Sequence, residues 1–424
     1  MSAGLTPDLG DDETLARLFA PVAGEPALGL AVSGGPDSLA LLLLAQRWAA
    51  TLPNPPRLIV YSLDHRLRPE AAAEVAMVLD LAQRLGLTAR GLAWTGDKPA
   101  TGVLEAARQA RYRRIGAAMA EDGASVLLTG HHRADQAETI LMRLAHGSGI
   151  EGLRGMAPLA MVEGVRVFRP LLGVEPATLA ALVAAAGLEA AHDPSNHDAS
   201  HERVRWRQKL PLLAEDGLDG AALARFAARM AEADAALAAM ADAAFAELVR
   251  LDGFAAATLA RPALMALSPA IGRRVLARLV TIAGGRQNPR ALAPVERLYD
   301  QIATGELPRA TTLLGAVIRL RGDKLVLCRE PGRALPADRP LPARAGLVWD
   351  ERFLITNASD DTDLVAGATD FLPRHRLEAV LGCKVTAPAE AIRTAPLVRD
   401  AAGSLLALGG WSFDDRVKVE LLVD

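Results

Sequence analysis

Apolar and polar positions alternate regularly through the first third of the chain. Short apolar runs predict buried strands at 28–32, 57–63, 88–94 and 125–129. The amphipathic stretches between and after them predict helices at 38–50, 69–86, 101–120 and 134–145. Strands that alternate with helices of this length predict an α/β fold with a doubly wound parallel sheet. Such sheets bind ligands beyond the carboxyl ends of their strands.

The second half follows a different pattern. Residues 217–251 are rich in alanine with a helical period and predict a long helix, whereas 311–328 predicts two strands joined at Gly322 and Asp323. Prolines between 331 and 342 mark a linker. We therefore expect four parts: an α/β domain (1–215), a mainly helical domain (216–330), a Pro-rich linker (331–346) and a small β-rich C-terminal domain (347–424).

The composition is that of an ordinary globular chain. Of the 424 residues, 51% are hydrophobic and 23% are charged, which argues against disorder. The apolar run 39–45 is far shorter than a membrane span, and no basic segment precedes an apolar stretch near the start, so we expect a cytoplasmic protein without a membrane partner. Cys328 and Cys383 form no CxxC motif. The net charge of −3 identifies no partner, although it can hide a local basic face.

The sequence Ser33-Gly34-Gly35-Pro36-Asp37-Ser38 separates the first predicted strand from its helix. A sharp turn from strand to helix presents backbone N–H groups at the positive end of the helix, and glycine lets that backbone approach an anion closely. The two serines add hydroxyl donors. The loop therefore predicts a phosphate-binding site. It has neither the lysine of a GxxxxGK[ST] loop nor the spacing of a dinucleotide-binding GxGxxG.

Asp37 adds information to this prediction. A carboxylate beside bound phosphates is repulsive unless a cation lies between them, so its presence indicates Mg²⁺. The alternative is an ordinary strand-to-helix turn with a capping serine and an acidic residue in the first helical turn.

A second polar segment, His131-His132-Arg133-Ala134-Asp135-Gln136-Ala137-Glu138-Thr139, follows the fourth predicted strand. Asp135 and Glu138 are three residues apart and therefore share one face of the predicted helix. The two carboxylates could hold a metal ion or receive a cationic substrate. They could also be acids that the helix dipole favours in a first turn. A metal-hydrolase site built from His131, His132 and Asp135 is a weaker alternative because the spacing is not HExxH.

Two arginine clusters suggest contacts with nucleic acid. One lies on the helix predicted at 101–120 (Arg108, Arg111, Arg113 and Arg114). In the other, Arg203, Arg205, Arg207 and Lys209 surround Trp206. Basic side chains neutralise RNA phosphates, and an aromatic ring among them can stack on an unpaired base. The alternative is a solvated helix face. The second cluster favours RNA, whereas the first leaves both interpretations open.

The loop at 33–38 resembles the SGGxDS loop of the N-type ATP pyrophosphatases. The segment 131–139 resembles the HHxxDQAET motif of the tRNA(Ile)-lysidine synthetase family and its tRNA-thiolase relatives. The segments 64–74, 105–115, 169–172 and 193–213 also resemble the synthetase family. On these motifs the chain is identified as a member of that family within the PP-loop superfamily, with the closest resemblance over the first half.

The resemblance implies a reaction in two steps on the wobble cytidine of tRNA(Ile) with a CAU anticodon. The cytosine C2 oxygen attacks the α-phosphate of ATP and releases pyrophosphate; the ε-amine of free L-lysine then attacks C2 and expels AMP. The amine arrives protonated, so Asp135 and Glu138 are the candidates to bind its ammonium and take a proton. The mainly helical domain would bind tRNA, and no protein partner is inferred.

The resemblance also implies the functional residues. The catalytic residues would be Asp37, Asp135 and Glu138, and Asp37 would hold Mg²⁺. ATP would be bound by Ser33, Gly34, Gly35, Pro36, Asp37, Ser38, Asp64, His65, Arg111, Gly130 and His131. The substrates would contact Asp135, Glu138, Arg203, Arg205 and Arg207.

Three other functions remain open. A tRNA thiolase would share both motifs but use cysteine chemistry, and two distant cysteines argue against it. An amidotransferase resembling GMP synthetase would need an ammonia source, and the sequence has no glutaminase-like cysteine motif. A non-catalytic RNA-binding protein would not need Asp37, Asp135 and Glu138.

Overall fold

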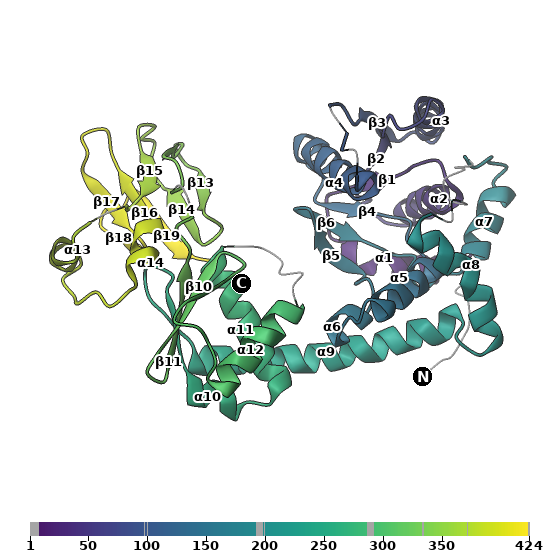
Figure 1. Cartoon of the computed structure of the whole chain (residues 1–424). Coiled ribbons are helices and arrows are strands. Elements are labelled where there is room, and N and C mark those ends of the chain that lie inside the picture. Colours follow the sequence, from purple (N-terminus) through teal and green to yellow (C-terminus); the bar gives the residue numbers. More distant parts are fainter. Residues whose placement is uncertain are drawn as a thin grey trace. The chain divides into compact units, whose positions relative to one another are not determined.

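The computed structural model describes residues 8–96, 98–99, 101–191, 198, 200–285, 292–332, 335–370 and 372–422. The chain forms two compact units, residues 1–234 and 235–424 (Figure 1). The boundary between the units falls within the long helix α9 (Gly220–Leu248). The bounds of this helix are close to the predicted 217–251. None of the helices in the described ranges is both long and apolar enough to cross a membrane.

The first unit is built on a six-stranded sheet with the order β3-β2-β1-β4-β6-β5. Its strands are β1 (Ala27–Ala31), β2 (Arg57–Asp64), β3 (Thr88–Ala93), β4 (Val126–Leu128), β5 (Leu159–Val162) and β6 (Val165–Phe168). All neighbours are parallel except β5 and β6. The chain runs from β1 outward to β3 and then returns to β4 on the other side of β1. This reversal creates a crevice at the carboxyl ends of β1 and β4, where such sheets bind ligands.

The predicted doubly wound fold is confirmed, with helices on both faces of the sheet. Leu28, Leu30 and Val60 point into one core, which is covered by α1 (Asp12–Phe19), α2 (Pro36–Ala50), α3 (Ala71–Arg84) and α7 (Pro176–Ala185). Ile59 and Tyr61 point to the other face, under α4 (Val103–Asp122). This alternation follows from the two-residue period of a strand. Neither β6 nor the antiparallel edge strand β5 was predicted.

Two further helices of the first unit pack on each other beside the sheet. These are α5 (Arg133–Ala145) and α8 (Glu202–Glu215), and α6 (Ile150–Leu153) follows α5. Ala137, Ile140 and Leu141 of α5 form a small apolar core with Trp206 and Leu210 of α8 and with the start of α9. This packing places the arginines of α8 beside the acidic start of α5. In the segment 193–213 that resembles the synthetase family, residues 193–197 and 199 lie outside the described residues.

The second unit contains two apolar cores. One core joins a five-stranded sheet to helices; its elements are β7 (Arg250–Leu251), β8 (Ala257–Ala260), β9 (Thr311–Leu313), β10 (Ala316–Arg321), β11 (Lys324–Arg329), α10 (Arg261–Ala266), α11 (Pro269–Gly284) and α12 (Leu292–Thr304). The two strands predicted within 311–328 are confirmed as β10 and β11, which Gly322 and Asp323 join, whereas the short β9 was not predicted. The region predicted as mainly helical therefore also carries a sheet.

The other core is β-rich, as predicted for the C-terminal part. Its sheets consist of β12 (Arg339–Pro340), β15 (Val365–Ala368), β16 (Pro396–Arg399), β17 (Leu405–Leu408) and β18 (Trp411–Ser412), and of β13 (Gly346–Trp349), β14 (Phe353–Asn357) and β19 (Val417–Leu421). The helices α13 (Arg374–Leu381) and α14 (Ala389–Thr394) accompany them. Residues 333 and 334 of the predicted linker lie outside the described residues, and β12 lies within the linker's bounds. The three predicted boundaries between these parts remain predictions.

Candidate active site

The loop between β1 and α2 depends on glycine for its shape. Gly34 has a φ of +89°, and a Cβ there would lie 3.0 Å from the Cε of Met77. A side chain at this position would therefore strain the backbone and also crowd α3. Gly35 is the N-cap of α2, and Pro36 begins the helix. The loop thus leads straight into the positive end of a helix, as the sequence predicts.

Ser38 stabilises this loop from inside. Its side chain is buried, its Oγ donates to the carbonyl of Gly35 (2.9 Å), and the same Oγ accepts from the N–H of Ser33 (3.1 Å). Ser33 is exposed. The Oγ atoms of the two serines are 3.4 Å apart. Ser38 therefore fixes the backbone of the loop, whereas Ser33 faces outward.

The loop after β4 lies directly against the start of α2. A Cβ on Gly130 would be 2.8 Å from the carbonyl oxygen of Asp37 and 3.2 Å from the backbone nitrogen of Ser38. Only glycine permits this approach, because any larger residue would force the two segments apart. The two sequence motifs are thereby joined through their backbones.

His132 connects the two motifs through its side chain. It is the N-cap of α5, where its Nδ1 accepts from the N–H of Asp135 (3.3 Å) and the carboxylate of Asp135 accepts from the N–H of His132 (3.0 Å). The His132 Nε2 lies 3.4 Å from the carboxylate of Asp37. Burial lowers the pKa of His132, but Asp37 and the nearby carboxylates outweigh it and raise the pKa above its usual value. The ring therefore orients Asp37.

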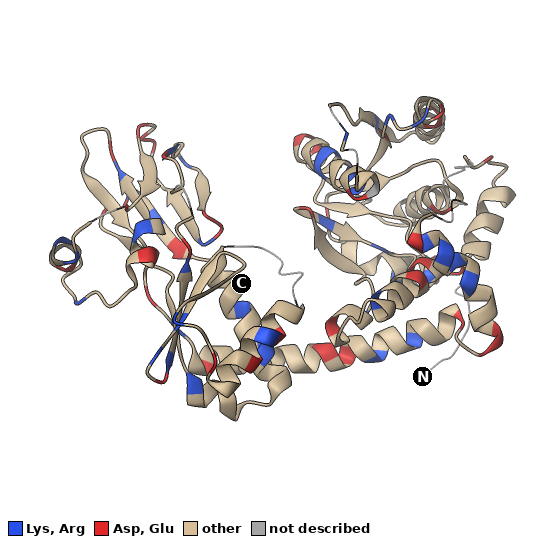
Figure 2. Cartoon of the chain, in the orientation of Figure 1, with Lys and Arg blue, Asp and Glu red and all other residues tan. Residues whose placement is uncertain are grey.

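Asp135 and Glu138 face α8, as their shared helix face predicts. Arg203 donates to both: its Nε is 2.5 Å from Glu138 and its second nitrogen is 2.8 Å from Asp135. Arg207 donates from its Nε to the other oxygen of Glu138 (2.7 Å), which raises the pKa of Arg207. Figure 2 shows acidic and basic segments adjoining where α5 meets α8. The Glu138 side chain has no exposed surface, whereas that of Asp135 is 14% exposed.

Neutral histidines lie at the same edge of the sheet. Burial, together with Arg169 and Arg203, lowers the pKa of His131 to about 2, and its Nδ1 lies 2.8 Å from the hydroxyl of Thr129. Burial and the charge of Arg111 lower the pKa of His65 to about 4. Both rings are therefore uncharged at neutral pH. Asp64 accepts from the N–H of Arg66 (2.6 Å) in the loop after β2.

Comparison with known proteins gives two kinds of match. Residues 8–213 match the family model described as a PP-loop domain. The chain is 46% identical to the tRNA(Ile)-lysidine synthase of Rhodopseudomonas palustris over 75% of its own length and 94% of that protein, and 43% identical to the enzyme of the same name from a Bradyrhizobium strain over the same shares. The chain belongs to the tRNA(Ile)-lysidine synthase family. This confirms the predicted family, and with it an ATP-using ligase of the PP-loop type.

A solved structure was also matched. It is a U34-tRNA thiolase from Methanococcus maripaludis with a [4Fe-4S] cluster, which is 16% identical, covers 52% of this chain and 79% of its own, and has a TM-score of 0.44. Membership of the lysidine synthase family rests on the sequence relatives, which the match covers over 94% of their own length.

Most of the predicted ATP-binding residues come from neighbouring loops at one edge of the sheet. The loop after β1 supplies Ser33 to Ser38, the loop after β2 supplies Asp64 and His65, and the loop after β4 supplies Gly130 and His131. Arg111 lies on α4 and its Nε is buried without a hydrogen-bond partner. Arg203 and Arg207 join this group through Asp135 and Glu138. Arg205 does not, since it is exposed and donates to the carbonyl of Ser200 (2.8 Å).

Sequence reasoning missed two residues of this site. His132 was considered only as a metal ligand, although its position just before a helix with Asp135 three residues later is the signal for a cap. Arg169 belongs to the segment 169–172 that resembles the synthetase family, but the sequence alone assigns it no role. It follows β6, the strand beside β4, and is 4% exposed.

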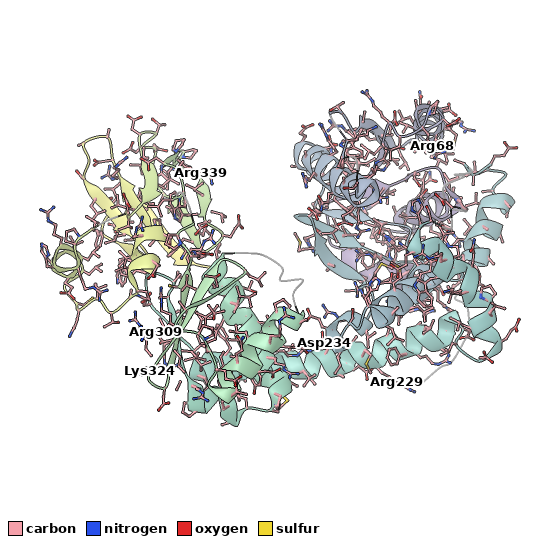
Figure 3. The ribbon with its side chains drawn as sticks, viewed as in Figure 1. Arg68, Arg229, Asp234, Arg309, Lys324 and Arg339 are labelled. Carbon is pink, nitrogen blue, oxygen red and sulfur yellow. The ribbon has the colours of Figure 1, made fainter. Side chains whose placement is uncertain are left out.

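The segment after α5 is fastened to its surroundings on two sides. Gln136 exchanges two hydrogen bonds with the backbone of Met156 (3.0 and 2.7 Å). Arg154 pairs with Asp234 of α9 at 2.8 Å, and Figure 3 labels Asp234. These contacts hold the chain between α6 and β5 against α5 and α9. Ala157 in the same segment accepts a hydrogen bond from Arg169.

Asp37 has the chemistry of a ligand for Mg²⁺ that is bound together with a nucleotide. Among the residues that the structure describes, no group of three or more His, Cys, Asp or Glu side chains could hold a metal alone. Mg²⁺ in nucleotide sites takes one or two carboxylates and completes its shell with phosphates and water. Asp37 is 35% exposed at the phosphate-binding loop and therefore fits such a ligand.

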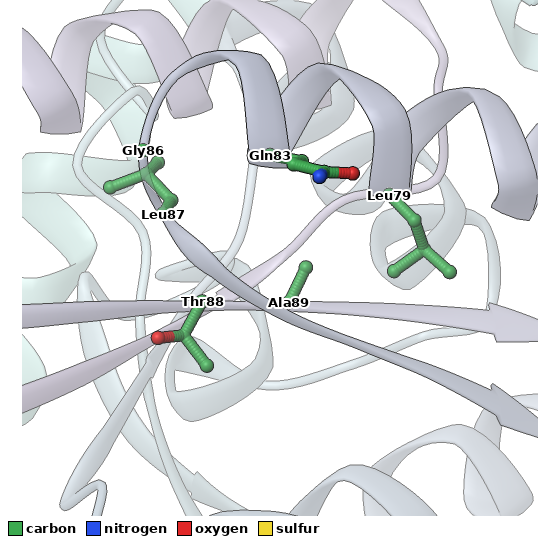
Figure 4. A pocket seen from close by; sticks show the side chains of 6 residues that line it. All are labelled: Leu79, Gln83, Gly86, Leu87, Thr88 and Ala89. Atoms are coloured by element: carbon green, nitrogen blue, oxygen red, sulfur yellow. The ribbon is translucent and has the colours of Figure 1, made fainter.

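A shallow hollow elsewhere in the first unit does not belong to this site. It measures about 470 Å³ and is lined by Leu79, Gln83, Gly86, Leu87, Thr88 and Ala89 (Figure 4). These residues lie at the end of α3 and the start of β3, which is the amino end of a parallel strand. The hollow is therefore on the edge of the sheet opposite to the active-site loops.

Proposed function

We propose that this protein ligates free L-lysine to C2 of the wobble cytidine of tRNA(Ile) with a CAU anticodon, using ATP and releasing pyrophosphate and AMP. The product, lysidine, would change both the codon that is read, to AUA, and the amino acid that the tRNA accepts. Membership of the lysidine synthase family supports this. The observation that carries the proposal is the contact of Gly130 with Asp37, because it joins the ATP-binding loop to the helix that bears Asp135 and Glu138.

The first step would take place at the loop between β1 and α2. Its backbone N–H groups and Ser33 would hold the departing pyrophosphate, and His65, Arg111 and His131 would complete the ATP site. A Mg²⁺ ion bound at Asp37 would offset negative charge during phosphoryl transfer. His132 would keep Asp37 in position. Because His131 is neutral, it can approach the nucleotide as a hydrogen-bonding group.

The second step needs a carboxylate that receives the lysine ammonium and takes its proton. Asp135 is the better candidate because part of its side chain is exposed, whereas Glu138 is enclosed by Arg203 and Arg207. We therefore assign proton removal to Asp135. Glu138 would act through the arginines and position Asp135 as well as α8.

Helix α8 would supply basic groups and an aromatic ring for contact with RNA. Lys209 lies 5.1 Å from the ring centroid of Trp206, and both Lys209 and Arg205 face outward. These groups suit an RNA phosphate and a stacked base. Arg203 and Arg207 are engaged by carboxylates, so their contribution to RNA would be smaller than the sequence alone indicates. Further contacts would come from the second unit, and the cytoplasm, where tRNA is modified, is the compartment that we propose.

One experiment tests the proposal. The purified protein is incubated with ATP, Mg²⁺, isotope-labelled lysine and unmodified tRNA(Ile), and the nucleosides are examined by mass spectrometry. A lysine-bearing cytidine is the expected product, and it should be absent without ATP. A thiolated nucleoside formed in the presence of a sulfur donor, with no lysine incorporated, would instead support the thiolase. Replacing Cys328 and Cys383 by Ser should leave lysine incorporation intact.

A further inference from the structure

Arg169 carries a charge that the proposed steps do not use. It lies immediately after β6, one strand beyond β4 along the active-site edge, and only 4% of it is exposed. One of its terminal nitrogens donates to the carbonyl of Ala157 (2.8 Å) and another hydrogen bond joins it to Tyr112. Its Nε is buried and has no hydrogen-bond partner.

Two more arginines lie beside Tyr112. Arg108 and Arg111 of α4 lie 5.2 and 5.9 Å from the ring centroid of Tyr112, the residue that Arg169 contacts. The Nε of Arg111 is likewise buried and unpartnered. Within the described ranges, no ion pair joins any of the three to a carboxylate, in contrast to Arg203 and Arg207. Burial and the neighbouring arginines lower the pKa values of Arg169 and Arg111.

This arrangement is costly in the free protein. A buried cation without a counter-charge is destabilising, and a buried donor without an acceptor adds to the cost. Both costs disappear when an anion with several oxygens occupies the space, and guanidinium groups match phosphate oxygens in geometry. The three arginines help to lower the pKa of the nearby His131, and because that ring is neutral it adds no further positive charge.

We propose that Arg169 and Arg108 form a phosphate-binding subsite beyond the ATP loop, next to His131. Two sources of phosphate are compatible with the proposed function: the phosphodiester beside the target cytidine of the tRNA, and the α-phosphate of ATP. The choice of these two phosphate sources rests on the proposed function. The subsite itself is argued from the buried, unpartnered Nε atoms of Arg169 and Arg111 and from Arg108 beside them at Tyr112.

The test compares Arg169→Gln and Arg169→Lys with a matched control on the same strand. Arg166 lies three residues earlier and pairs with Glu25 at 3.0 Å, so Arg166→Gln removes an arginine of β6 that is already neutralised. Three quantities are measured: the shift in melting temperature with inorganic phosphate, the Kd of a non-hydrolysable ATP analogue without tRNA, and the Kd of tRNA at several salt concentrations without ATP.

We expect Arg169→Gln to melt no lower than the wild type without ligand and to gain less from inorganic phosphate. An RNA source predicts a loss of tRNA affinity of roughly tenfold to a hundredfold and a fall in the salt slope by about 0.7–0.9. An ATP source predicts the same loss for the analogue and an unchanged salt slope. Arg169→Lys should retain part of the affinity, and Arg166→Gln all of it.

The proposal is wrong if Arg169→Gln retains the phosphate response and both affinities, or if Arg166→Gln shows the same losses. Should Arg169→Gln fail to fold, Arg108→Gln on the half-exposed face of α4 gives the same readings. Lysine incorporation by the wild type is followed separately. If the wild type incorporates no lysine but Arg169→Gln still loses the phosphate response, the proposed function fails while the subsite stands.

Discussion

The Nε of Arg203 donates a 2.5 Å hydrogen bond to the carboxylate of Glu138, whose side chain has no exposed surface. Arg207 binds the other oxygen of the same carboxylate at 2.7 Å. A carboxylate can be buried in this way only when its charge is neutralised and its oxygens are hydrogen-bonded. Glu138 therefore joins α8 to α5 and, through Arg203, restrains Asp135.

Replacing Glu138 by Gln should both destabilise the first unit and impair the second chemical step. The change leaves two half-buried guanidinium groups with Asp135 as their one remaining carboxylate among the described contacts, which costs about 3 kcal/mol in the free energy of unfolding. Because Asp135 loses its alignment, lysine transfer should slow far more than pyrophosphate release, and adenylated tRNA should accumulate. A higher pH should restore part of the rate, since more lysine then arrives unprotonated. Single-turnover assays that follow pyrophosphate and lysidine separately measure this.

Glu175→Gln is the matched control for that variant. Glu175 pairs with Arg133, the first residue of α5, at 2.6 Å, but the Glu175 side chain is 40% exposed. Its loss should cost at most about 1 kcal/mol and leave both chemical steps unchanged. If pyrophosphate release and lysine transfer slow equally in Glu138→Gln, Glu138 serves the ATP site instead.

Asp37→Asn should abolish pyrophosphate release while the protein stays folded. The amide keeps the size of the side chain and can still meet His132, but it lacks the charge that would hold Mg²⁺. Pyrophosphate and AMP are measured with ATP and tRNA, alongside a thermal melt. Removal of divalent ions with a chelator should have the same effect on the wild type, and added Mg²⁺ should restore the wild type alone. Normal pyrophosphate release by Asp37→Asn would exclude the metal-binding role.

Gly130→Ala should weaken ATP binding without removing any functional side chain. The new methyl group would lie 2.8 Å from the carbonyl oxygen of Asp37, so α2 and the loop after β4 must separate. The expected cost is about 1–3 kcal/mol in unfolding free energy, with a loss of affinity for an ATP analogue of about tenfold or more. Gly24→Ala is the control, because a Cβ there meets nothing within 4 Å. Equal analogue affinity in the two variants would show that the contact is not required.

Much of the first unit could be predicted because its signals are local. The apolar runs and the glycine-rich turn report on their own residues, and the order of strands and helices limits the topology to a parallel sheet. Strands β5 and β6 were missed because each is only four residues long and their pairing with each other spans a two-residue turn. Their hairpin turns at Glu163 and Gly164, both with positive φ, which a two-residue turn requires.

The sequence predicted which residues gather at the site better than it predicted the contacts between them. The spacing of Asp135 and Glu138 correctly places them on one helix face, but it carries no information about what faces that helix. The pairing of Glu138 with Arg203 spans 65 residues of sequence and depends on how α8 packs on α5. The sequence therefore suggested RNA contacts for all the arginines of α8, whereas two of them are bound to carboxylates within the protein.

Two histidines with lowered pKa values, His65 and His131, predict a contribution to the pH dependence of stability in the absence of ATP. His65 has a pKa of about 4 in the folded protein against 6.5 for an unburied ring, and the pKa of His131 is lower still. Below pH 6.5 the unfolded chain therefore binds protons that the folded chain does not, so stability is complete above 6.5 and falls as the pH drops towards 4. Each ring contributes a slope of up to about 1.4 kcal/mol per pH unit. His65→Gln should reduce that slope by one histidine, as should His131→Gln, whatever each change does to stability at neutral pH. Urea unfolding between pH 4.5 and 7.5 measures the slopes, and a slope equal to that of the wild type in both variants would mean that the two rings do not stay neutral.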